Sequence, residues 1–573
     1  MRPEELSISD ITDIWNLFEK GKNYNQRMGV YSDTDRNYRM YNGNQWAGLP
    51  KSPKKSIEPI QLNIIRKIVR HKVGNINTNN YLPVFSADNF NNNEFKETAI
   101  KTCELLNKLV SRVWEKDSMD YKTRSISKHS AINDECPIYI TYDNETNMPV
   151  HEIISKNDIY YGNENDSDIQ NQPYILIKQR KPVINLIEMA KAQGVSDEKL
   201  KYIIGDNDTV EEAGDSAKEE VDDKCTLITK LYKKDGQVHF SQATKFCVIK
   251  EDKNTGLTLY PVAHMLWEEK EGSARGEGEV RYLIANQLEI NKTEMRRLIA
   301  AKLNAYQQKI VDISKIVNPK AIDQTGATIK VNGVGIDDVK KAIGTLNPSQ
   351  MSPDAEKVMN ELITITRDLA EASEVATGDI RPDIASGKAI LAVQQANQMP
   401  LTEQVLALKT TLEDAARIWL DMWKTYATDG LIIDYEEINQ LTGEKTSKPV
   451  KVPFTVLQEL KATVKVDITP KSSYDKFAQE LSLENMLKAG YFHPQRLNEL
   501  EIYVDLLDDD SSMPKSKLIE AVKRMKETQK RIAQIQTQAQ QLQMQVDKYL
   551  GTQSDIAGIG QFGNNLINQV MPS

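Results

Sequence analysis

Two glycine-containing segments carry residue types that could bind phosphate groups. Residues 276–281 read GEGEVR, which begins like the dinucleotide-binding GxGxxG pattern, but Arg281 stands at the third glycine position. Residues 386–389 read SGKA, like the end of a P-loop. There, Pro382 and Ala389 replace the first glycine and the Ser/Thr that binds Mg²⁺. The sequence therefore disfavours a dinucleotide enzyme and an ATPase.

Residue types that form catalytic or metal centres are scattered along the chain. The four cysteines fit no CxxC zinc pattern, which indicates reduced structural thiols, and the six histidines form no HxH or HExxH pair. Neighbouring carboxylates at Asp337 and Asp338 lie in a turn context, which favours solvated loop acids. GxSxG and protein kinase signatures are absent. We therefore predict no enzyme activity, no metal site and no cofactor.

A cluster of basic residues indicates a binding function and not a catalytic one. Between Asn291 and Lys309, five bases face the single acid Glu294; the bases are Lys292, Arg296, Arg297, Lys302 and Lys309. Such a patch could contact DNA phosphates without reading sequence. The alternative is that these bases pair with acids of neighbouring subunits. The net charge of the whole chain is -9, which would prevent tight DNA binding.

A second basic segment lies nearer the N-terminus. Residues 59–76 predict an amphipathic helix whose basic members are Arg66, Lys67, Arg70, His71 and Lys72. A basic amphipathic helix could contact nucleic acid or a membrane surface. A solvated face is the commoner role for such charges.

Long helices position the first basic cluster. From Val280, apolar residues recur in three- and four-residue steps, which predicts a helix to about Gln308 that would span roughly 40 Å. A compact insert follows, and a second helix begins near Asp354. A loop at residues 378–387 leads to another long helix, residues 388–428, which Pro400 should kink. Two long helices around a small insert suit a protein that spans a distance.

The remaining segments predict a mixture of helices and strands. Residues 1–130 read mostly as helices, residues 131–270 as a mixed region with antiparallel strands, and strands recur from Gly430. The last predicted helix, residues 515–550, carries a near-heptad apolar stripe in a Gln-rich background. We predict a helix-rich α+β fold. No apolar run reaches the ~18 residues that span a bilayer, and no signal-peptide core is present, so we expect no membrane segment and no secretion.

Several motifs resemble those of portal proteins of tailed double-stranded DNA bacteriophages. They are YNGNQW (41–46), QLNIIRKIVRHKVG (61–74), ISKNDIYYGNE (154–164), RGEGEVRYLIANQLEINKTEMRR (275–297) and TGDIRPDIASGKAILAVQQ (377–395). Their order over nearly the whole chain carries the resemblance more than any single motif. One departure is NDECP (133–137), where many relatives have a GxG-like turn. It affects local strand geometry more than function.

The resemblance implies a head-to-tail connector ring, usually of twelve subunits, at one vertex of the capsid in the virion, assembled in the host cytoplasm. The ring would be a channel for DNA packaging and DNA ejection. Its implied partners are further copies of the chain, double-stranded DNA bound without sequence specificity, the terminase large subunit, the major capsid protein and a tail adaptor or head-completion protein. Scaffolding protein is a further candidate, and no membrane is involved.

The resemblance also implies a portal-like division of the chain. An α/β wing would occupy residues 1–270 and return at 430–505. Two stem helices would occupy 271–308 and 354–377, around a small α/β clip at 309–353. A tunnel loop at 378–387 would lead to a kinked tunnel or wing helix at 388–429, and a helical crown with a flexible tail would occupy 506–573.

The implied functional residues form two groups. The tunnel loop and stem would meet DNA through Asp379, Arg381, Asp383, Lys388, Arg296, Arg297 and Lys302. The clip would dock terminase or the adaptor through Lys315, Lys320, Lys330, Asp337, Asp338, Lys340 and Lys341. Two alternatives remain: an oligomeric coiled-coil scaffold or adaptor that assembles through residues 515–550, and an enzyme, such as a nuclease, whose site the sequence does not reveal. A closed ring with an axial hole separates the portal from the scaffold.

Overall fold

The computed structural model divides the chain into two compact units. Unit 1 spans Met1–Thr469 and unit 2 spans Pro470–Ser573. The structure describes residues 12–47, 60–87, 93–206, 223–305, 308–324, 327–332, 335, 343–346, 353–372, 399–438, 445–470, 483, 486–488, 503–504 and 515–550. Both helices and strands are present, so the predicted α+β class is confirmed.

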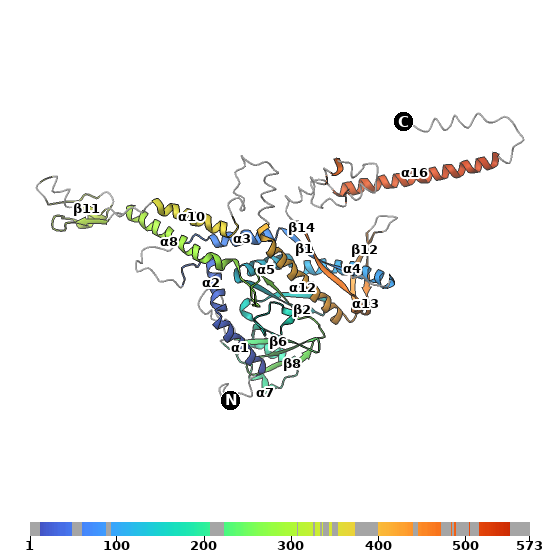
Figure 1. Cartoon of the computed structure of the whole chain (residues 1–573), viewed down its shortest axis with the longest axis horizontal. Coiled ribbons are helices and arrows are strands. Elements are labelled where there is room, and N and C mark those ends of the chain that lie inside the picture. The colour runs from blue at the N-terminus through green and yellow to red at the C-terminus, as the bar shows by residue number, and fades with distance from the viewer. Residues whose placement is uncertain are drawn as a thin grey trace, which may run out of the picture. The chain divides into compact units, whose positions relative to one another are not determined.

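Helices form the N-terminal part of unit 1 (Figure 1). Two of them begin at polar caps: the Thr12 side chain accepts a hydrogen bond from Trp15 N, and the Asn63 side chain accepts one from Arg66 N. The second helix ends at Gly43, whose φ of 97° is a left-handed conformation that glycine adopts readily. The helices are α1 (Asp13–Arg27), α2 (Val30–Asn42), α3 (Ile64–Ile76), α4 (Asn93–Lys116) and α5 (Met119–Asn133).

Two antiparallel sheets follow, as the alternating pattern predicts. The first has the strand order β3-β2-β9, built from β2 (Glu135–Asp143), β3 (Met148–Ile153) and β9 (Val262–Leu266). The second has the order β4-β5-β6-β7-β8, built from β4 (Ile159–Tyr161), β5 (Tyr174–Pro182), β6 (Lys224–Lys234), β7 (Gln237–Ala243) and β8 (Val248–Asn254). Helices α6 (Val183–Ala192) and α7 (Asp197–Leu200) share a small apolar cluster with this second sheet.

Helix α12 (Thr402–Tyr426) lies in the main core of unit 1. It packs against β9, β1 and β2, and its Trp419 and Trp423 side chains are fully buried. Pro400 lies directly before it, in the 3₁₀ turn η6 (Met399–Leu401). The part of the predicted kinked helix before Met399 lies outside the described residues.

Shorter elements complete unit 1. Strand β1 (Asn79–Ala87) pairs with β14 (Ala462–Pro470), which joins distant parts of the sequence. Strands β12 (Leu431–Ile438) and β13 (Lys445–Val452) form an antiparallel pair. The remaining elements are α13 (Phe454–Glu459), η3 (Lys156–Asp158), η4 (Ile169–Asn171) and η5 (Pro319–Asp323).

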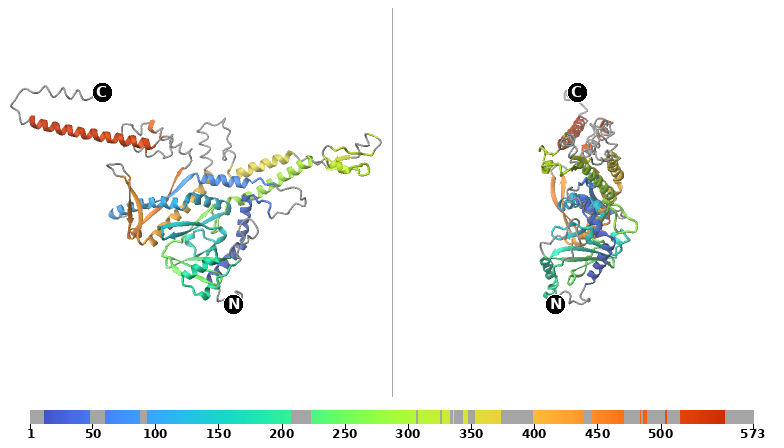
Figure 2. Two further views of the ribbon diagram at one scale, coloured as in Figure 1. Left: turned by 180° about the vertical axis from the view of Figure 1, so that it is seen from behind. Right: turned by 90° about the vertical axis from the view of Figure 1, so that its left-hand side faces the viewer.

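A two-helix arm projects from the body of unit 1 (Figures 1 and 2). It consists of α8 (Glu279–Ala305) and α10 (Pro353–Leu369), which pack side by side, and of the antiparallel strands β10 (Gln308–Val311) and β11 (Ile343–Leu346) at its far end. The helix predicted from Val280 to about Gln308 is α8. We use the name two-helix arm for these four elements.

Unit 2 contains the long helix α16 (Lys515–Leu550). Val522 packs with Tyr503 and Val504 in a small apolar cluster. Further along, Ile532, Ile535 and Leu542 are 50%, 63% and 61% exposed. These three positions of the predicted near-heptad stripe are therefore exposed.

Candidate functional site: the base of the two-helix arm

The first group of predicted DNA-contacting residues is described only in part. Arg296, Arg297 and Lys302 lie on α8. Asp379, Arg381, Asp383 and Lys388 lie outside the described residues.

Carboxylates of the same chain accompany the α8 arginines. Arg296 Nη1 lies 3.2 Å from Glu289 Oε1, and Arg297 Nη2 lies 2.9 Å from Glu294 Oε1. Arg297 Nη1 also lies 3.5 Å from Glu356 Oε1 on α10. These arginine side chains are 64% and 43% exposed, so each pair contributes about 1 kcal/mol or less and can exchange partners. Three bases of the predicted cluster, Lys292, Arg296 and Arg297, therefore have carboxylate partners within the arm.

The far end of the arm presents apolar and basic side chains together. Ile310, Ile313 and Val317 are 57%, 76% and 57% exposed. Lys315, Lys320 and Lys330 are exposed nearby in sequence, and Lys315 lies 3.5 Å from Asp312. Exposed apolar side chains rimmed by charges are typical of protein interaction surfaces. The other residues predicted for this surface, Asp337, Asp338, Lys340 and Lys341, lie outside the described residues.

The base of the arm is a buried ionic junction between sequence motifs that are far apart. Arg275 forms an ion pair with Glu135, whose side chain is fully buried. Arg275 Nη2 also donates to Ile159 O at 3.0 Å. Burial by itself would raise the pKa of Glu135, but Arg275, followed by His264 and Lys156, outweighs it and holds the pKa at about 2. Glu135 therefore stays ionised and fixes Arg275 in the core.

Asp134 connects the same segments through its backbone and its side chain. Its carboxylate forms a buried ion pair with Lys156 and accepts a hydrogen bond from Gly278 N at 2.8 Å. Its carbonyl oxygen accepts from Trp267 N at 3.0 Å. The φ of Asp134 is 75°, a left-handed conformation that Asp tolerates better than most residues. The chain departs from the portal-like pattern at this segment, and Asp134 there adopts a positive φ that glycine favours while adding two side-chain contacts.

The glycines of GEGEVR allow close packing of the backbone in this structure. A Cβ on Gly276 would lie 2.6 Å from Glu268 O, and a Cβ on Gly278 would lie 2.8 Å from Asp134 N. Both distances are far below van der Waals contact. The glycines thus let the segment before α8 approach the turn after α5, which explains their spacing without a phosphate ligand.

Amide side chains of α8 hold the start of α3. Gln287 Oε1 accepts from the backbone N–H groups of Ile64 and Ile65, and Gln287 Nε2 donates to Leu62 O at 2.6 Å. Asn291 Oδ1 accepts from Leu62 N at 3.0 Å. The first N–H groups of a helix lack partners within the helix, and α8 supplies them here. Together with the buried Lys72–Glu279 ion pair of 2.8 Å, these contacts fix α8 against α3.

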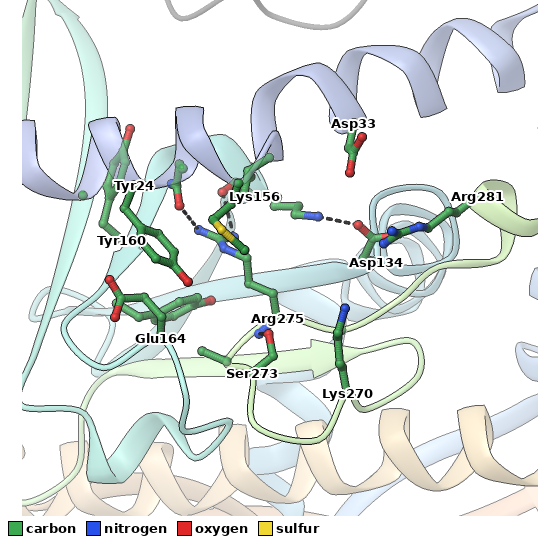
Figure 3. A pocket seen from close by; sticks show the side chains of 17 residues that line it. Tyr24, Asp33, Asp134, Lys156, Tyr160, Glu164, Lys270, Ser273, Arg275 and Arg281 are labelled. Atoms are coloured by element: carbon green, nitrogen blue, oxygen red, sulfur yellow. Dashed lines mark hydrogen bonds and ion pairs between the residues drawn. The ribbon is translucent and has the colours of Figure 1, made fainter.

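A polar cavity of about 120 Å³ lies beside the junction (Figure 3). Basic side chains of Lys156, Lys270 and Arg275 face acidic side chains of Asp134 and Glu164 around it. Pockets for cofactor-sized ligands usually occupy 300–1,000 Å³, so this space suits a few water molecules. The cavity belongs to the polar packing of the junction.

One buried constellation looks like a catalytic dyad but is structural. His151 Nδ1 lies 2.6 Å from Asp117 Oδ2, and Trp419 Nε1 donates to His151 Nε2 at 2.8 Å. Because an indole nitrogen only donates, Nε2 is unprotonated and Nδ1 carries the proton. The nitrogen that a general base would use is therefore occupied by Trp419. The constellation joins α12 to β3.

Metal-ligand clusters and membrane-spanning helices are both absent from the described part of the chain. It contains no group of three or more His, Cys, Asp or Glu side chains arranged to hold a metal ion. Within the same residues, no helix is long and apolar enough to cross a membrane.

Sequence reasoning found the motifs of the junction but not their contacts. Lys156, Arg275 and Glu279 lie inside the segments that resemble portal proteins, while Asp134 and Glu135 lie in the segment that departs from them. The sequence does not show that these segments lie next to one another in the fold. No local pattern indicates that Glu135 pairs with a residue 140 positions away.

The fold and this junction define an α+β protein built around an anchored two-helix arm. A family model described as Phage P22-like portal protein matches residues 155–557. The match covers more than half of the chain, and the chain therefore belongs to the P22-like family of phage portal proteins. No curated protein matches the chain.

Proposed function

We propose that this chain forms a closed ring of twelve copies at one capsid vertex, with an axial channel for DNA packaging and ejection. The observation that carries the proposal is the two-helix arm, a projecting pair of helices fixed to the body by a buried ionic junction. Membership of the portal family supports the same function. In this ring α8 and α10 are the stem helices, and the residues between them are the clip.

The remaining assignments follow from the same proposal. The wing comprises residues 1–270 and 430–505, residues 378–387 form the tunnel loop, residues 388–429 form the tunnel or wing helix, and residues 506–573 form the crown. The exposed apolar and basic side chains at the far end of the arm suit docking of the terminase large subunit and then a tail adaptor or head-completion protein. The major capsid protein and scaffolding protein are further partners, and the chain itself carries out no chemistry.

DNA contact in the channel is assigned to the tunnel loop and the stem. Arg381 and Lys388 are the proposed contacts of the loop, flanked by Asp379 and Asp383. On the stem, Arg296, Arg297 and Lys302 are exposed, and the weak surface ion pairs of the arginines can yield to phosphates. Such contacts are independent of base sequence and allow DNA to slide.

A specific observation favours one second candidate. The exposed Ile532, Ile535 and Leu542 of α16 could form a coiled-coil interface, which would suit a scaffold or adaptor without a channel.

Negative-stain electron microscopy with native mass spectrometry separates the two candidates. We expect a closed ring with a hole wide enough for duplex DNA and a mass near twelve times 65.0 kDa. A small oligomer without a hole would favour the coiled-coil scaffold. Robust ATPase or nuclease activity of the purified chain would contradict a purely structural role.

A further inference from the structure

A second basic surface lies on α3 and α5, outside the two-helix arm. Its members are five exposed side chains: Arg66, Lys67 and Arg70 on α3, with Arg124 and Lys128 on α5. Arg66 and Arg70, like Arg124 and Lys128, lie one helical turn apart. Helix α3 packs against both α5 and α8 (Figure 1). We call these five side chains the α3–α5 basic surface. It lies wholly before residue 155, where the match to the portal family model begins.

The buried ring of Tyr41 lies beside a basic side chain from each of the two helices. Arg66 Cζ lies 5.9 Å from the centre of the Tyr41 ring, and Lys128 Nζ lies 5.5 Å from the same centre. Tyr41 itself is only 6% exposed. A ring face attracts cations and orients them, so two side chains from different helices are positioned beside one another.

The α3–α5 basic surface is not charge-compensated, in contrast to the arm. Helix α3 contains no acidic residue, and its one buried base, Lys72, is paired with Glu279. Within the described part of the chain, no carboxylate lies at ion-pair distance from any of the five side chains. The α8 arginines have such carboxylates. Among the described residues, these five bases of α3 and α5 therefore lack the carboxylate partners that Arg296 and Arg297 of α8 have.

Two histidines beside the surface have pKa values that nearby lysines lower. Burial lowers the pKa of His71, and Lys67 and Lys72 lower it further. Burial also lowers the pKa of His129, with a further contribution from Lys128. Both imidazoles are therefore favoured in the neutral form. They add hydrogen-bonding groups to the surface but no negative charge that would offset its bases.

We propose that the α3–α5 basic surface binds the phosphate backbone of double-stranded DNA, as a contact separate from the stem and tunnel loop. Uncompensated Arg and Lys on one face, in a chain with a net charge of -9, match a polyanion with closely spaced phosphates. Three of the five side chains are arginines, whose planar guanidinium binds phosphate through two hydrogen bonds. This inference rests on the proposed function, which brings DNA to the ring.

Salt-dependent binding of a labelled duplex of arbitrary sequence to the purified full-length oligomer tests the proposal. The variant Arg66→Gln/Lys67→Gln/Arg70→Gln removes three charges from α3. We expect the slope of log K against log salt to fall by about 2.7 if each side chain contacts one phosphate, which is about a hundredfold loss of affinity at 0.15 M salt. Variant Lys191→Gln/Lys199→Gln/Lys201→Gln, which removes three exposed charges from α6, α7 and the residue after it, should leave the slope unchanged.

Three outcomes overturn the proposal. The first is an α3 variant with the same slope as the unsubstituted chain, and the second is an equal loss in the Lys191 control variant. The third is an α3 variant that no longer forms the parent oligomer yet still binds duplex, because the surface would then serve contacts between copies. A chain that forms no ring and binds no duplex would instead contradict the proposed function itself.

Discussion

Arg275 and Glu135 show how a single ion pair fixes the base of the arm. The Glu135 side chain is fully buried and the Arg275 side chain is 14% exposed, and each is the main partner that offsets the burial of the other. Burial would lower the pKa of Arg275, and Glu135 reverses that effect. A buried pair of this kind costs more to break than it contributes when intact, because the remaining charge is left without a partner.

The variant Arg275→Gln should therefore lose about 3–5 kcal/mol of unfolding free energy, measured by urea denaturation followed by tryptophan fluorescence. Arg281→Gln is the matched control, since its 3.6 Å pair with Glu277 is 45% exposed on the Arg281 side. It should change the free energy by less than about 1 kcal/mol. Similar losses in both variants would show that the junction does not depend on the buried pair.

His151 makes stability depend on pH. Burial lowers its pKa below the ordinary value of 6.5, although Asp117 acts in the opposite direction. The unfolded chain then binds the proton more readily than the folded chain does. Stability from neutral His151 is complete above pH 6.5 and is lost as the pH falls below 6.5 toward the folded pKa.

We expect the urea concentration at the unfolding midpoint to decrease as the pH is lowered from 7.5 to 5. The His151→Gln variant should show a smaller decrease. Some dependence should persist, because the pKa values of His71 and His129 are lowered too. Glu135 adds a second loss between its ordinary value of 4.5 and its folded pKa of about 2. Identical pH profiles for His151→Gln and the parent would contradict the role given to His151.

At the scale of elements, α3 and α8 depend on each other. The sequence places an Asn cap at the start of α3, but the next donors are satisfied by Gln287 of α8. Gln287 is fully buried, so no water replaces it there. The position of the arm and the start of α3 are thus set by the same side chain.

The variant Gln287→Leu should cost about 1–3 kcal/mol, since it leaves the buried Ile65 N–H without a partner. Ile64 N and Leu62 O each lose one bond but keep the bond to each other at 2.9 Å. Amide hydrogen exchange at Ile64 and Ile65 should accelerate. Asn63→Ala, which removes the cap and the bond from Asn63 Nδ2 to Tyr41 O at 2.9 Å, should cost about 1–2 kcal/mol. Asn286→Leu, one residue earlier on α8 and partly exposed, serves as the control with little effect. Unchanged exchange in Gln287→Leu would contradict the coupling of the two helices.

At the scale of the whole molecule, the two units have separate apolar clusters. The main core of unit 1 ends at Val466, whereas the cluster of unit 2 is formed by residues after Pro470. All six tryptophans lie in unit 1. Unit 1 therefore has an apolar core of its own and should be able to fold independently.

A chain that ends at Pro470 should keep β14 paired with β1 and fold without unit 2. We expect the same tryptophan emission maximum as in the full chain and a cooperative melt within a few degrees of it, measured by fluorescence and circular dichroism. The corresponding chain that ends at Thr463 removes most of β14 and should melt lower. A red-shifted emission without a transition would show that unit 1 needs unit 2.

Several elements could be predicted from the sequence alone because their signals are local. The apolar periodicity after Val280 predicts α8 to within a few residues of its observed ends, and alternation in residues 131–270 predicts antiparallel strands. The basic character of residues 59–76 is likewise visible in the sequence. The order of the portal-like motifs indicates the family that the family model confirms.

Only the tertiary structure decided which charges are compensated. The sequence directs attention to Arg296 and Arg297, but folding places Glu289, Glu294 and Glu356 beside them. It leaves Arg66 and Lys128 over one Tyr41 ring, with no carboxylate of the described residues at ion-pair distance. Ion pairing depends on distances of a few ångströms between residues far apart in the chain, and only the fold sets those distances. For the same reason the glycines of GEGEVR resemble a phosphate loop in the sequence and prove to be packing positions in the structure.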